Sequence, residues 1–497
     1  IVEKNRLCSR EYAYRNIHFP RNEQYYKTAK FRIIYEQLLI YQLAIRLNRK
    51  RLEDTSSISS VKEISIKPFI DALPFELTEG QKKCIQEIER DLSIARPMNR
   101  LIQGDVGCGK TVVAEAAIFR CVKAGHQAVM MVPTEILAKQ HFERLNNDLL
   151  KVGIHSCLLT SRMKASDRRK ALERIKCGNI DLVIGTHAVL TDDVAFHNLA
   201  LAITDEQHRF GVNQRKKLVE KGRGVNICVM SATPIPRTLA ATVFGDMDFS
   251  IIRTKPVGRR EIITKAVNQE SRERAYTTVR KELEKGHRAY VVAPSIEDDN
   301  EGLSSVEELY SELERKFYKY KVAYLHGKMS KEDKDRIMND FADGKIDILV
   351  ATVVVEVGID VSDATIIVIE NSERFGLAQL HQLRGRVGRS SMQSYCYLVN
   401  YSKSENARMR TNAMVNISDG FEISEEDYRL RGPGDLTGTM QSGNYQSRIL
   451  FLCKYTDILE MAVNDAFNIM TGNYNLDMEI VKIYMNTMYE VDNSDII

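Results

Sequence analysis

The sequence predicts an α/β protein with two tandem doubly wound parallel sheets and helical N- and C-terminal appendages. Apolar strand segments alternate with helical patterns from Leu77 to Thr254, and the same alternation begins again near residue 287. This alternation is typical of βα units on a parallel sheet that is buried on both faces. A glycine-rich loop at 101–111 lies within the first repeat, where a strand would end and a helix begin.

The expected strands can be located from these apolar segments. In the first repeat, the first strand includes Leu101 and Ile102 and leads into the glycine-rich loop, and the others are expected at 128–133, 181–186, 199–204 and 226–233. In the second repeat, strands are expected at 287–294, 320–327, 346–352, 365–371 and 394–400. Pro256 and Gly258 in KPVGRR mark the seam between the repeats. The expected domains are an N-terminal helical segment at 1–72, two sheet domains at 73–256 and 257–415, and a C-terminal region at 416–497.

Both appendages show helical periodicity. Apolar residues three and four apart between Thr28 and Glu53 predict an amphipathic helix, and the serine-rich stretch 55–60 after it reads as a linker. Apolar positions between Ile449 and Met461 predict a further helix, and residues 296–302 an acidic surface loop.

Composition limits the class of protein. A chain of 497 residues has room for roughly two to four domains, and 43% hydrophobic with 28% charged residues is ordinary for a globular protein. No apolar run approaches the ~18 residues of a membrane span, and no leader pattern is seen, so a cytoplasmic location is expected. The net charge of +4 is too small to require a polyanionic partner. Nine cysteines without a C-x-x-C pair indicate neither a disulfide framework nor a zinc site.

The glycine-rich loop predicts a nucleotide site. Gly104, Gly109, Lys110 and Thr111 fit the pattern G-x-x-x-x-G-K-[ST]. Backbone N–H groups of such a loop face an anion, the following helix N-terminus adds its positive dipole end, and the lysine supplies a mobile charge. A triphosphate is the expected ligand, with the threonine hydroxyl on its magnesium ion. The alternative is a plain glycine-rich turn with a surface lysine, and Cys108 in the loop reads either as a small side chain that fits or as a modification site.

Two carboxylates follow the expected strand 199–204. Asp205 would hold magnesium through water, and Glu206 would orient or deprotonate the attacking water. Two acids at a strand end are also common on solvated surface, but a phosphate loop in the same sheet favours the catalytic role. His208 either reads the nucleotide state or is a polar loop histidine.

The second repeat supplies arginines. Gln382, Gly385, Arg386, Gly388 and Arg389 form Q-x-x-G-R-x-G-R. The planar donor fork of arginine grips phosphate oxygens, and a finger from a neighbouring domain can be worth ~10³–10⁵ in rate. A basic helix face is the alternative, although glycines between the arginines would weaken a plain helix.

The order of these motifs resembles a known group of proteins. GDVGCGKT, VPTEILAKQH, DEQH, SATPIPRTLA, HGKM, ATVVVEVGID and QLHQLRGRVGR together resemble the superfamily 2 helicases and translocases. IHFP, LPFELTEGQ, FGVNQR, EEDYRLRGPGD and GTMQSG further resemble the RecG family of ATP-dependent DNA helicases. The resemblance covers nearly the whole chain and implies two RecA-like lobes with ATP and Mg²⁺ in the cleft.

The resemblance also implies roles for individual residues. Gln81 would contact the nucleotide base, and the phosphates and magnesium would be bound by Gly104, Gly107, Gly109, Lys110 and Thr111. Asp205 and Glu206 would act on the metal and the water, and Arg386 and Arg389 would stabilise the transition state. Gly358 and Asp360 would link the nucleotide and DNA sites. For DNA binding or coupling the implied residues are Thr134, Thr186, His187, His208, Ser231, Thr233, Thr352, Gln382, Arg429, Arg431 and Gln441.

The expected function is that of an ATP-dependent DNA helicase or double-stranded DNA translocase acting on branched DNA in recombination and repair. The resemblance further implies a monomer and a contact with single-stranded DNA-binding protein. Two departures stand out: Cys108 replaces a serine, and residues 1–60 show no strands for the wedge barrel that RecG proteins carry. Fork specificity is therefore left open. A duplex translocase of the transcription-repair coupling type and a nucleotide-gated branched-DNA binding module are the alternatives, and an RNA-unwinding enzyme would not need the segment after residue 415.

Overall fold

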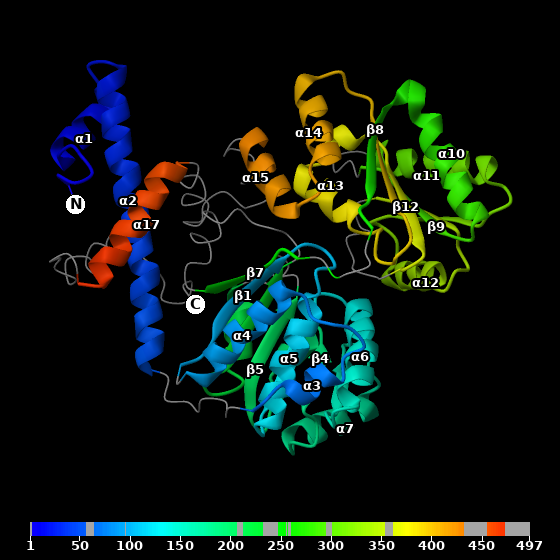
Figure 1. Cartoon of the computed structure of the whole chain (residues 1–497), viewed down its shortest axis with the longest axis horizontal. Coiled ribbons are helices and arrows are strands. Elements are labelled where there is room, and N and C mark those ends of the chain that lie inside the picture. The colour runs from blue at the N-terminus through cyan, green and yellow to red at the C-terminus, as the bar shows by residue number, and fades with distance from the viewer. Residues whose placement is uncertain are drawn as a thin grey trace.

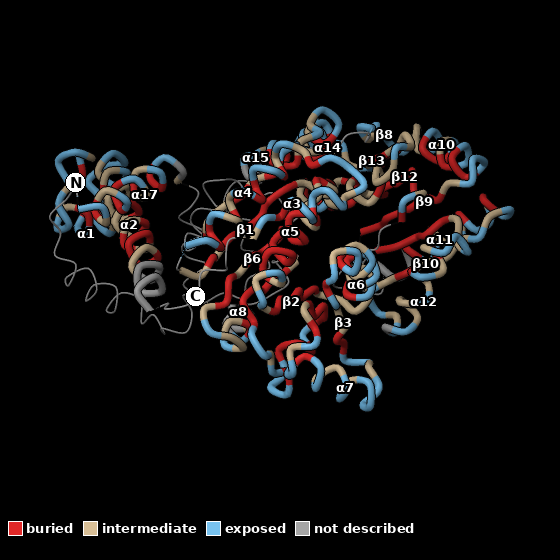
Figure 2. Tube along the Cα trace, turned by 60° about the horizontal axis from the view of Figure 1, so that its bottom comes forward, coloured by how far each residue is buried: buried red, intermediate tan, exposed pale blue. Residues whose placement is uncertain are grey.

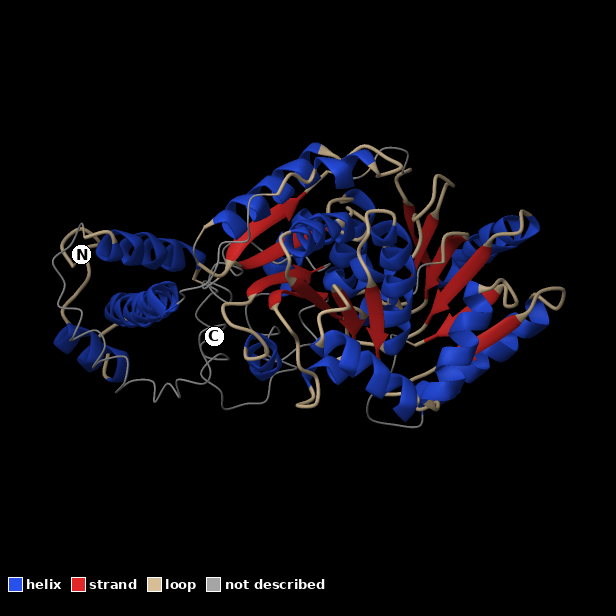
Figure 3. Cartoon of the chain, turned by 90° about the horizontal axis from the view of Figure 1, so that it is seen from below, coloured by secondary structure: helices blue, strands red, loops and turns tan. Residues whose placement is uncertain are grey.

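The computed structural model describes residues 2–55, 64–94, 96–205, 212–231, 247–254, 256, 260–294, 301–352, 361–431 and 455–472. Two separate sheets lie in these residues, each covered by helices, and every pairing between described strands is parallel (Figure 3). The predicted fold class is therefore confirmed.

The first lobe has seven strands in the order β3-β4-β2-β5-β6-β1-β7. Their bounds are β1 (Asn99–Gly104), β2 (Gln127–Met131), β3 (Ser156–Leu159), β4 (Leu182–Gly185), β5 (Leu199–Asp205), β6 (Asn226–Ser231) and β7 (Asp248–Ile252). The helices are α3 (Lys67–Asp71), α4 (Glu79–Ser93), α5 (Lys110–Lys123), α6 (Glu135–Leu150), α7 (Ala165–Lys176), α8 (Val212–Val219) and the 3₁₀ turn η1 (His187–Leu190).

The second lobe has six strands in the order β10-β11-β9-β12-β13-β8. Their bounds are β8 (Ile263–Asn268), β9 (Arg288–Val292), β10 (Val322–Leu325), β11 (Ile348–Ala351), β12 (Ala364–Ile369) and β13 (Tyr395–Asn400). The helices are α10 (Arg272–Glu284), α11 (Glu301–Lys316), α12 (Lys331–Ala342), α13 (Leu377–Arg384), α14 (Glu405–Asn416) and α15 (Gly420–Arg431), with 3₁₀ turns η3 (Gln269–Ser271) and η5 (Ser372–Arg374).

Burial explains which strands the sequence revealed. The central strands are buried along nearly their whole length, and Figure 2 shows them as continuous buried segments inside each lobe. Because both faces are covered, their sequences are continuous apolar runs. The strands that were not predicted, β3, β7 and β8, lie at sheet edges and are mostly accessible: β3 has one buried residue, β7 has two and β8 has none. These edge strands lack the continuous apolar run of a central strand, whereas the edge strand β10 was still predicted from its sequence.

The core of the first lobe begins before the strands do. Ile66, just before α3, and Phe69, within α3, belong to the same buried cluster as Ile85 of α4 and Val113 of α5. The rings of Phe69 and Phe119 lie 5.7 Å apart. This packing extends the core upstream of Leu73, where the sequence placed the start of the domain.

The N-terminal helices meet a helix from near residue 460 in a separate helical unit, which lies beside the lobes in Figure 1. It contains α1 (Arg10–His18), α2 (Glu23–Thr55) and α17 (Thr456–Met470), and α2 confirms the predicted N-terminal helix. Leu38 of α2 packs against Leu459 and Ala462 of α17. The predicted linker after Thr55, the acidic residues before Glu301 and the apolar positions at 449–452 lie outside the described residues. Among the described helices, none is long and apolar enough to cross a bilayer.

Candidate functional site

The phosphate loop joins β1 to α5. Gly107 and Gly109 have φ values of 75° and 88°, in the left-handed region that favours glycine, and Gly109 is the residue from which α5 begins. The Lys110 ammonium donates to the carbonyl oxygens of Gly104 at 2.7 Å and Asp105 at 3.0 Å. The lysine is thus held at the mouth of the loop, and Thr111 lies in the first turn of α5 beside it.

Gln81 ties α4 to this loop. Its side-chain amide nitrogen donates to the carbonyl oxygen of Cys108 at 2.8 Å, and its amide oxygen accepts from the backbone N–H of Thr78 at 2.9 Å. Thr78 in turn caps α4, so the two residues form a capping box. The side chain is 2% exposed. A contact of Gln81 with the nucleotide base stays a prediction; in this structure its amide fixes the loop.

Cys108 is a buried packing residue of the loop. Its side chain belongs to the core of the first lobe, and burial raises the pKa of its thiol. A thiol that stays protonated and inaccessible is chemically inert. Its surroundings are those of a small side chain that fits the loop.

Asp205 lies at the carboxyl edge of the first sheet. It ends β5, which pairs with β6, and β6 pairs with β1, so Asp205 and the phosphate loop share one edge. Its carboxylate lies 3.3 Å from Nε2 of His141 on α6. Carboxylate and hydroxyl oxygens suit Mg²⁺, which is usually bound by one or two protein groups and the phosphates of a nucleotide. Asp205 and Thr111 therefore fit the ion.

The arginine segment of the second lobe lies directly against the phosphate loop. Arg386 and Arg389 follow α13 and are half-buried. A methyl group added at Gly385 would come within 2.9 Å of the Cβ atom of Val106, so only glycine allows this approach. The lobes thus meet at the two segments, the phosphate loop and the arginine segment, that the sequence assigned to the two halves of one site.

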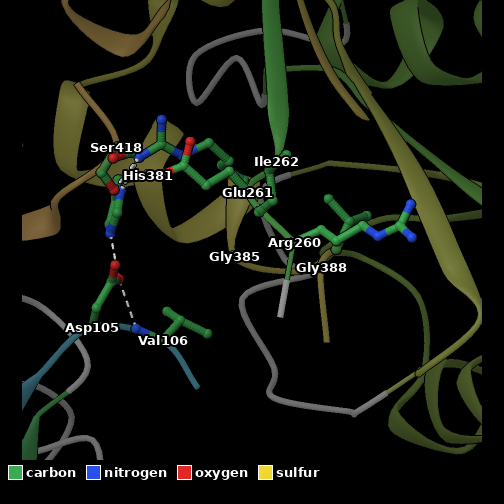
Figure 4. Close-up of a pocket in the computed structure, with 11 residues that line it drawn as sticks. Asp105, Val106, Arg260, Glu261, Ile262, His381, Gly385, Gly388 and Ser418 are labelled. Atoms are coloured by element: carbon green, nitrogen blue, oxygen red, sulfur yellow. Dashed lines mark hydrogen bonds and ion pairs between the residues drawn. The ribbon is translucent and has the colours of Figure 1, made fainter. Parts of the chain in front are cut away.

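A pocket of about 80 Å³ lies at this meeting point (Figure 4). Asp105 and Val106 of the loop line one side, and Arg260, His381 and Arg384 are among the residues on the other. Nε2 of His381 lies 2.6 Å from a carboxylate oxygen of Asp105. Sequence reasoning assigned no role to His381, because a histidine within a helical motif gives no sign of which residue it will contact in another lobe.

The threonines expected at the DNA follow the carboxyl ends of strands. Thr134 caps α6 and accepts from the backbone N–H of Leu137 at 3.4 Å, and Thr186 is buried before η1, next to the exposed His187. Thr352 is buried after β11, and its hydroxyl has no hydrogen-bond partner within the described part of the chain. Thr134 and His187 are accessible, whereas Thr186 and Thr352 are buried, and contacts of these residues with DNA stay predictions.

The remaining predicted residues are distributed as follows. Ser231 ends β6 and is buried, Gln382 lies on α13, Arg429 is exposed on α15 beside Glu426 at 3.1 Å, and Arg431 ends α15. Glu206, His208, Thr233, Gly358, Asp360 and Gln441 lie outside the described residues. The roles of both sets stay predictions.

A phosphate loop in one RecA-like lobe and an arginine segment in a second define the class of helicases and translocases. Family models agree: the DEAD/DEAH box helicase model matches residues 78–242, the helicase conserved C-terminal domain matches 273–391, and the C-terminal part of domain 3 of the ATP-dependent DNA helicase RecG matches 417–494.

Relatives place the chain more narrowly. It is 44% identical over 483 residues to the ATP-dependent DNA helicase RecG of Thermotoga maritima, covering 97% of this chain and 62% of that protein. It is 45% identical to RecG of Staphylococcus epidermidis, covering 93% of this chain and 68% of that protein. The chain belongs to the RecG family of ATP-dependent DNA helicases.

Solved structures give the same result. A structure of RecG bound to a three-way DNA junction superposes with a TM-score of 0.78 at 42% identity, covering 92% of this chain and 61% of that one. The DNA-bound helicase MrfA, at 16% identity and a TM-score of 0.54 over 73% of this chain and 55% of that one, shares the fold alone. The chain thus spans about three fifths of the length of two of these RecG proteins.

Proposed function

We propose that the chain is an ATP-driven motor that translocates on duplex DNA and unwinds branched DNA. The observation that carries the proposal is the contact of Gly385 with Val106, because it places the arginine segment of one lobe against the phosphate loop of the other. A site divided between two lobes is completed by closure and disrupted by opening. Alternation between these states is how nucleotide hydrolysis can drive movement.

In the proposed reaction the protein mainly positions charges. Lys110 leaves the loop carbonyls for the phosphates. Thr111, and Asp205 through water, would hold a Mg²⁺ ion, which would supply positive charge against the phosphate oxygens. Glu206 orients the attacking water. Arg386 and Arg389 stabilise the charge that develops on the transferred phosphoryl group as the lobes close.

The proposed substrate is branched DNA, as at stalled forks and Holliday junctions during recombination and repair. Support comes from the RecG structure bound to a three-way junction and from the family match over residues 417–494. The accessible Thr134, which follows β2, suits a contact to the DNA backbone, a kind of contact that carries no sequence information. A bacterial cytosolic location, a monomeric motor and contact with single-stranded DNA-binding protein remain predictions from the family resemblance.

The test is the ATPase rate with single-stranded, duplex, forked and four-way DNA at one fixed salt concentration, since phosphate contacts make affinity steeply salt dependent. Forked or four-way DNA is expected to raise the rate most. Stimulation by duplex alone would favour a duplex translocase that displaces proteins without unwinding, and a rate indifferent to all DNA would favour a nucleotide-gated binding module.

Two variants separate hydrolysis from movement. Lys110→Ala is expected to abolish turnover while DNA binding survives, whereas Lys151→Ala, which removes an exposed lysine paired with Asp148, is the control. Arg431→Ala is expected to keep hydrolysis and lose unwinding, with the exposed Arg408→Ala as its control. Loss of DNA binding in the first variant, or intact fork unwinding in the second, would reject the corresponding role.

A further inference from the structure

Arg384 is a buried cation, 5% exposed, at the end of α13. Its guanidinium donates to the backbone carbonyl oxygens of Met414 at 3.0 Å, Ile417 at 2.9 Å and Ser418 at 3.1 Å. These carbonyls lie at the C-terminus of α14, the negative end of its dipole. Arg384 thus fixes the junction between α14 and α15 to α13.

The same guanidinium fixes the tautomer of His381. One Nη nitrogen of Arg384 lies 2.9 Å from Nδ1 of His381. Because arginine can only donate, Nδ1 must accept, and the ring proton of the neutral imidazole must be on Nε2. Nε2 therefore donates to the carboxylate of Asp105 at 2.6 Å. We assign these proton positions from the chemistry of the partners.

Asp105 connects this imidazole to the phosphate loop. The carboxylate oxygen that faces His381 also accepts from the backbone N–H of Val106 at 2.7 Å, and the backbone carbonyl of Asp105 accepts from Lys110. In the proposed function a triphosphate draws both Lys110 and the loop N–H groups toward itself. Nucleotide binding therefore changes the partners of the residue that His381 contacts.

One end of α13 is bonded to α15 and the other to the turn that precedes α15. At the N-terminal end, the backbone N–H of Leu377 donates to the carboxylate of Asp427 on α15 at 3.3 Å. At the C-terminal end, Arg384 holds Ser418, one residue before Asp419, whose carboxylate caps α15 at 2.7 Å from the N–H of Phe421. A shift of α13 is therefore transmitted to α15, the helix that carries Arg429 and ends at Arg431.

We propose that His381 is a positioning residue that transmits the nucleotide state of the phosphate loop to α15. Figure 4 shows the first contact of this chain, in which the imidazole of His381 points across the pocket at Asp105 of the phosphate loop. The proposal rests on the proposed function, because it requires a nucleotide at the loop. In this role His381 acts through Asp105 on one side and Arg384 on the other.

The first test uses amide hydrogen exchange with a non-hydrolysable ATP analogue and Mg²⁺, without DNA. In the wild-type chain, nucleotide is expected to change exchange both at 104–111 and at 414–431. His381→Ala should keep the response at 104–111 and lose at least half of that at 414–431. The matched control is His287→Ala, which removes a comparable 2.8 Å contact with Glu282 at the α10 to β9 turn.

The possible results separate the two proposals. A wild-type chain without a response at 104–111 would contradict the proposed nucleotide site itself. A wild-type response at 104–111 alone, or a full response at 414–431 in His381→Ala, would overturn the role of His381. Loss of both responses in His381→Ala would assign the residue to nucleotide binding and would also overturn it. His381→Gln, whose amide retains one donor and one acceptor, guards against misfolding and should restore part of the response.

The second test is kinetic. His381→Ala should lower the number of base pairs unwound per ATP hydrolysed about tenfold and change the KM for ATP less than about twofold, within the usual range of coupling between sites. In a double-mutant cycle, His381→Ala should add little to Asp105→Ala, because both remove one contact. Fully additive losses, or the same loss in His287→Ala, would show that the contact transmits nothing.

Discussion

The guanidinium of Arg162 in the first lobe lies 2.9 Å from the carboxylate of Asp335 in the second. A second nitrogen of the same group lies 2.9 Å from Glu332, also on α12, and Nε lies 3.3 Å from Glu135 on α6. One arginine thus bridges the lobes at a point outside the phosphate loop. Its side chain is 42% exposed, so the pairs act through water-screened charge.

Arg162→Ala is expected to weaken closure of the lobes. Exposed pairs are worth about 0.2–1 kcal/mol, so the KM for ATP should rise by no more than about fivefold at low salt. The effect should fade at about 0.5 M salt, where screening is strong. Steady-state ATPase measurements at both salt concentrations check this, and Arg169→Ala, which loses a pair within α7 alone, is the control. An undiminished change at high salt would contradict an electrostatic role.

Gly385→Ala is expected to lower kcat at least tenfold while hardly changing the unfolding midpoint. The new Cβ would meet Val106 across the cleft and hold the lobes apart, at little cost to the fold of either lobe. Gly344→Ala is the matched control and should affect stability but not catalysis, because Gly344 has a φ of 76° and open space around it. That variant should lose about 1 kcal/mol of stability and keep its kcat. Thermal melts and ATPase rates together distinguish the two.

Glu115→Gln is expected to stabilise the chain at alkaline pH. Burial raises the pKa of Glu115 to about 7, and its Oε1 atom has no hydrogen-bond partner among the described residues. Since the unfolded pKa is near 4.3, the cost of ionising this carboxyl is absent below about pH 4 and grows until about pH 7. The gain in unfolding free energy should be about 2 kcal/mol larger at pH 8 than at pH 5. Equal gains at both pH values would reject this, and the exposed Glu143→Gln is the control.

Asp465 makes the packing of α17 on α2 sensitive to acid. Burial acts to raise the pKa of Asp465, but hydrogen bonds from Lys4, Tyr35 and Asn5 outweigh it and lower the pKa below its ordinary value. This stabilisation is present above the unfolded pKa of about 3.9 and is lost as the pH falls through the lower folded value.

The unfolding midpoint of the wild type should therefore fall more steeply below about pH 4 than that of Asp465→Asn. Melting curves between pH 3 and pH 6 measure the difference. Asp457→Asn on the exposed side of α17 should behave as the wild type, and parallel curves for all three proteins would contradict the role of Asp465.

The sequence predicted what depends on local pattern. Continuous apolar runs located the central strands, and the glycine-rich loop identified the start of α5. Contacts between the lobes could not be predicted from the sequence, because no local pattern shows that Gly385 contacts Val106 or that His381 contacts Asp105. Gln81 illustrates the same limit: its motif suggested a base contact, whereas its capping role and its bond to Cys108 depend on how α4 packs beside the loop.

The pairing of α2 with α17 has a consequence for synthesis of the chain. Leu38 and Leu43 on α2 are covered by residues made more than 400 positions later, such as Leu459 and Ala466. A ribosome adds about 5–20 residues per second, so the apolar side of α2 stays uncovered for tens of seconds until α17 has been synthesised. Throughout that time the nascent chain presents a surface suited to chaperones, and an early stop of translation leaves that surface permanently exposed.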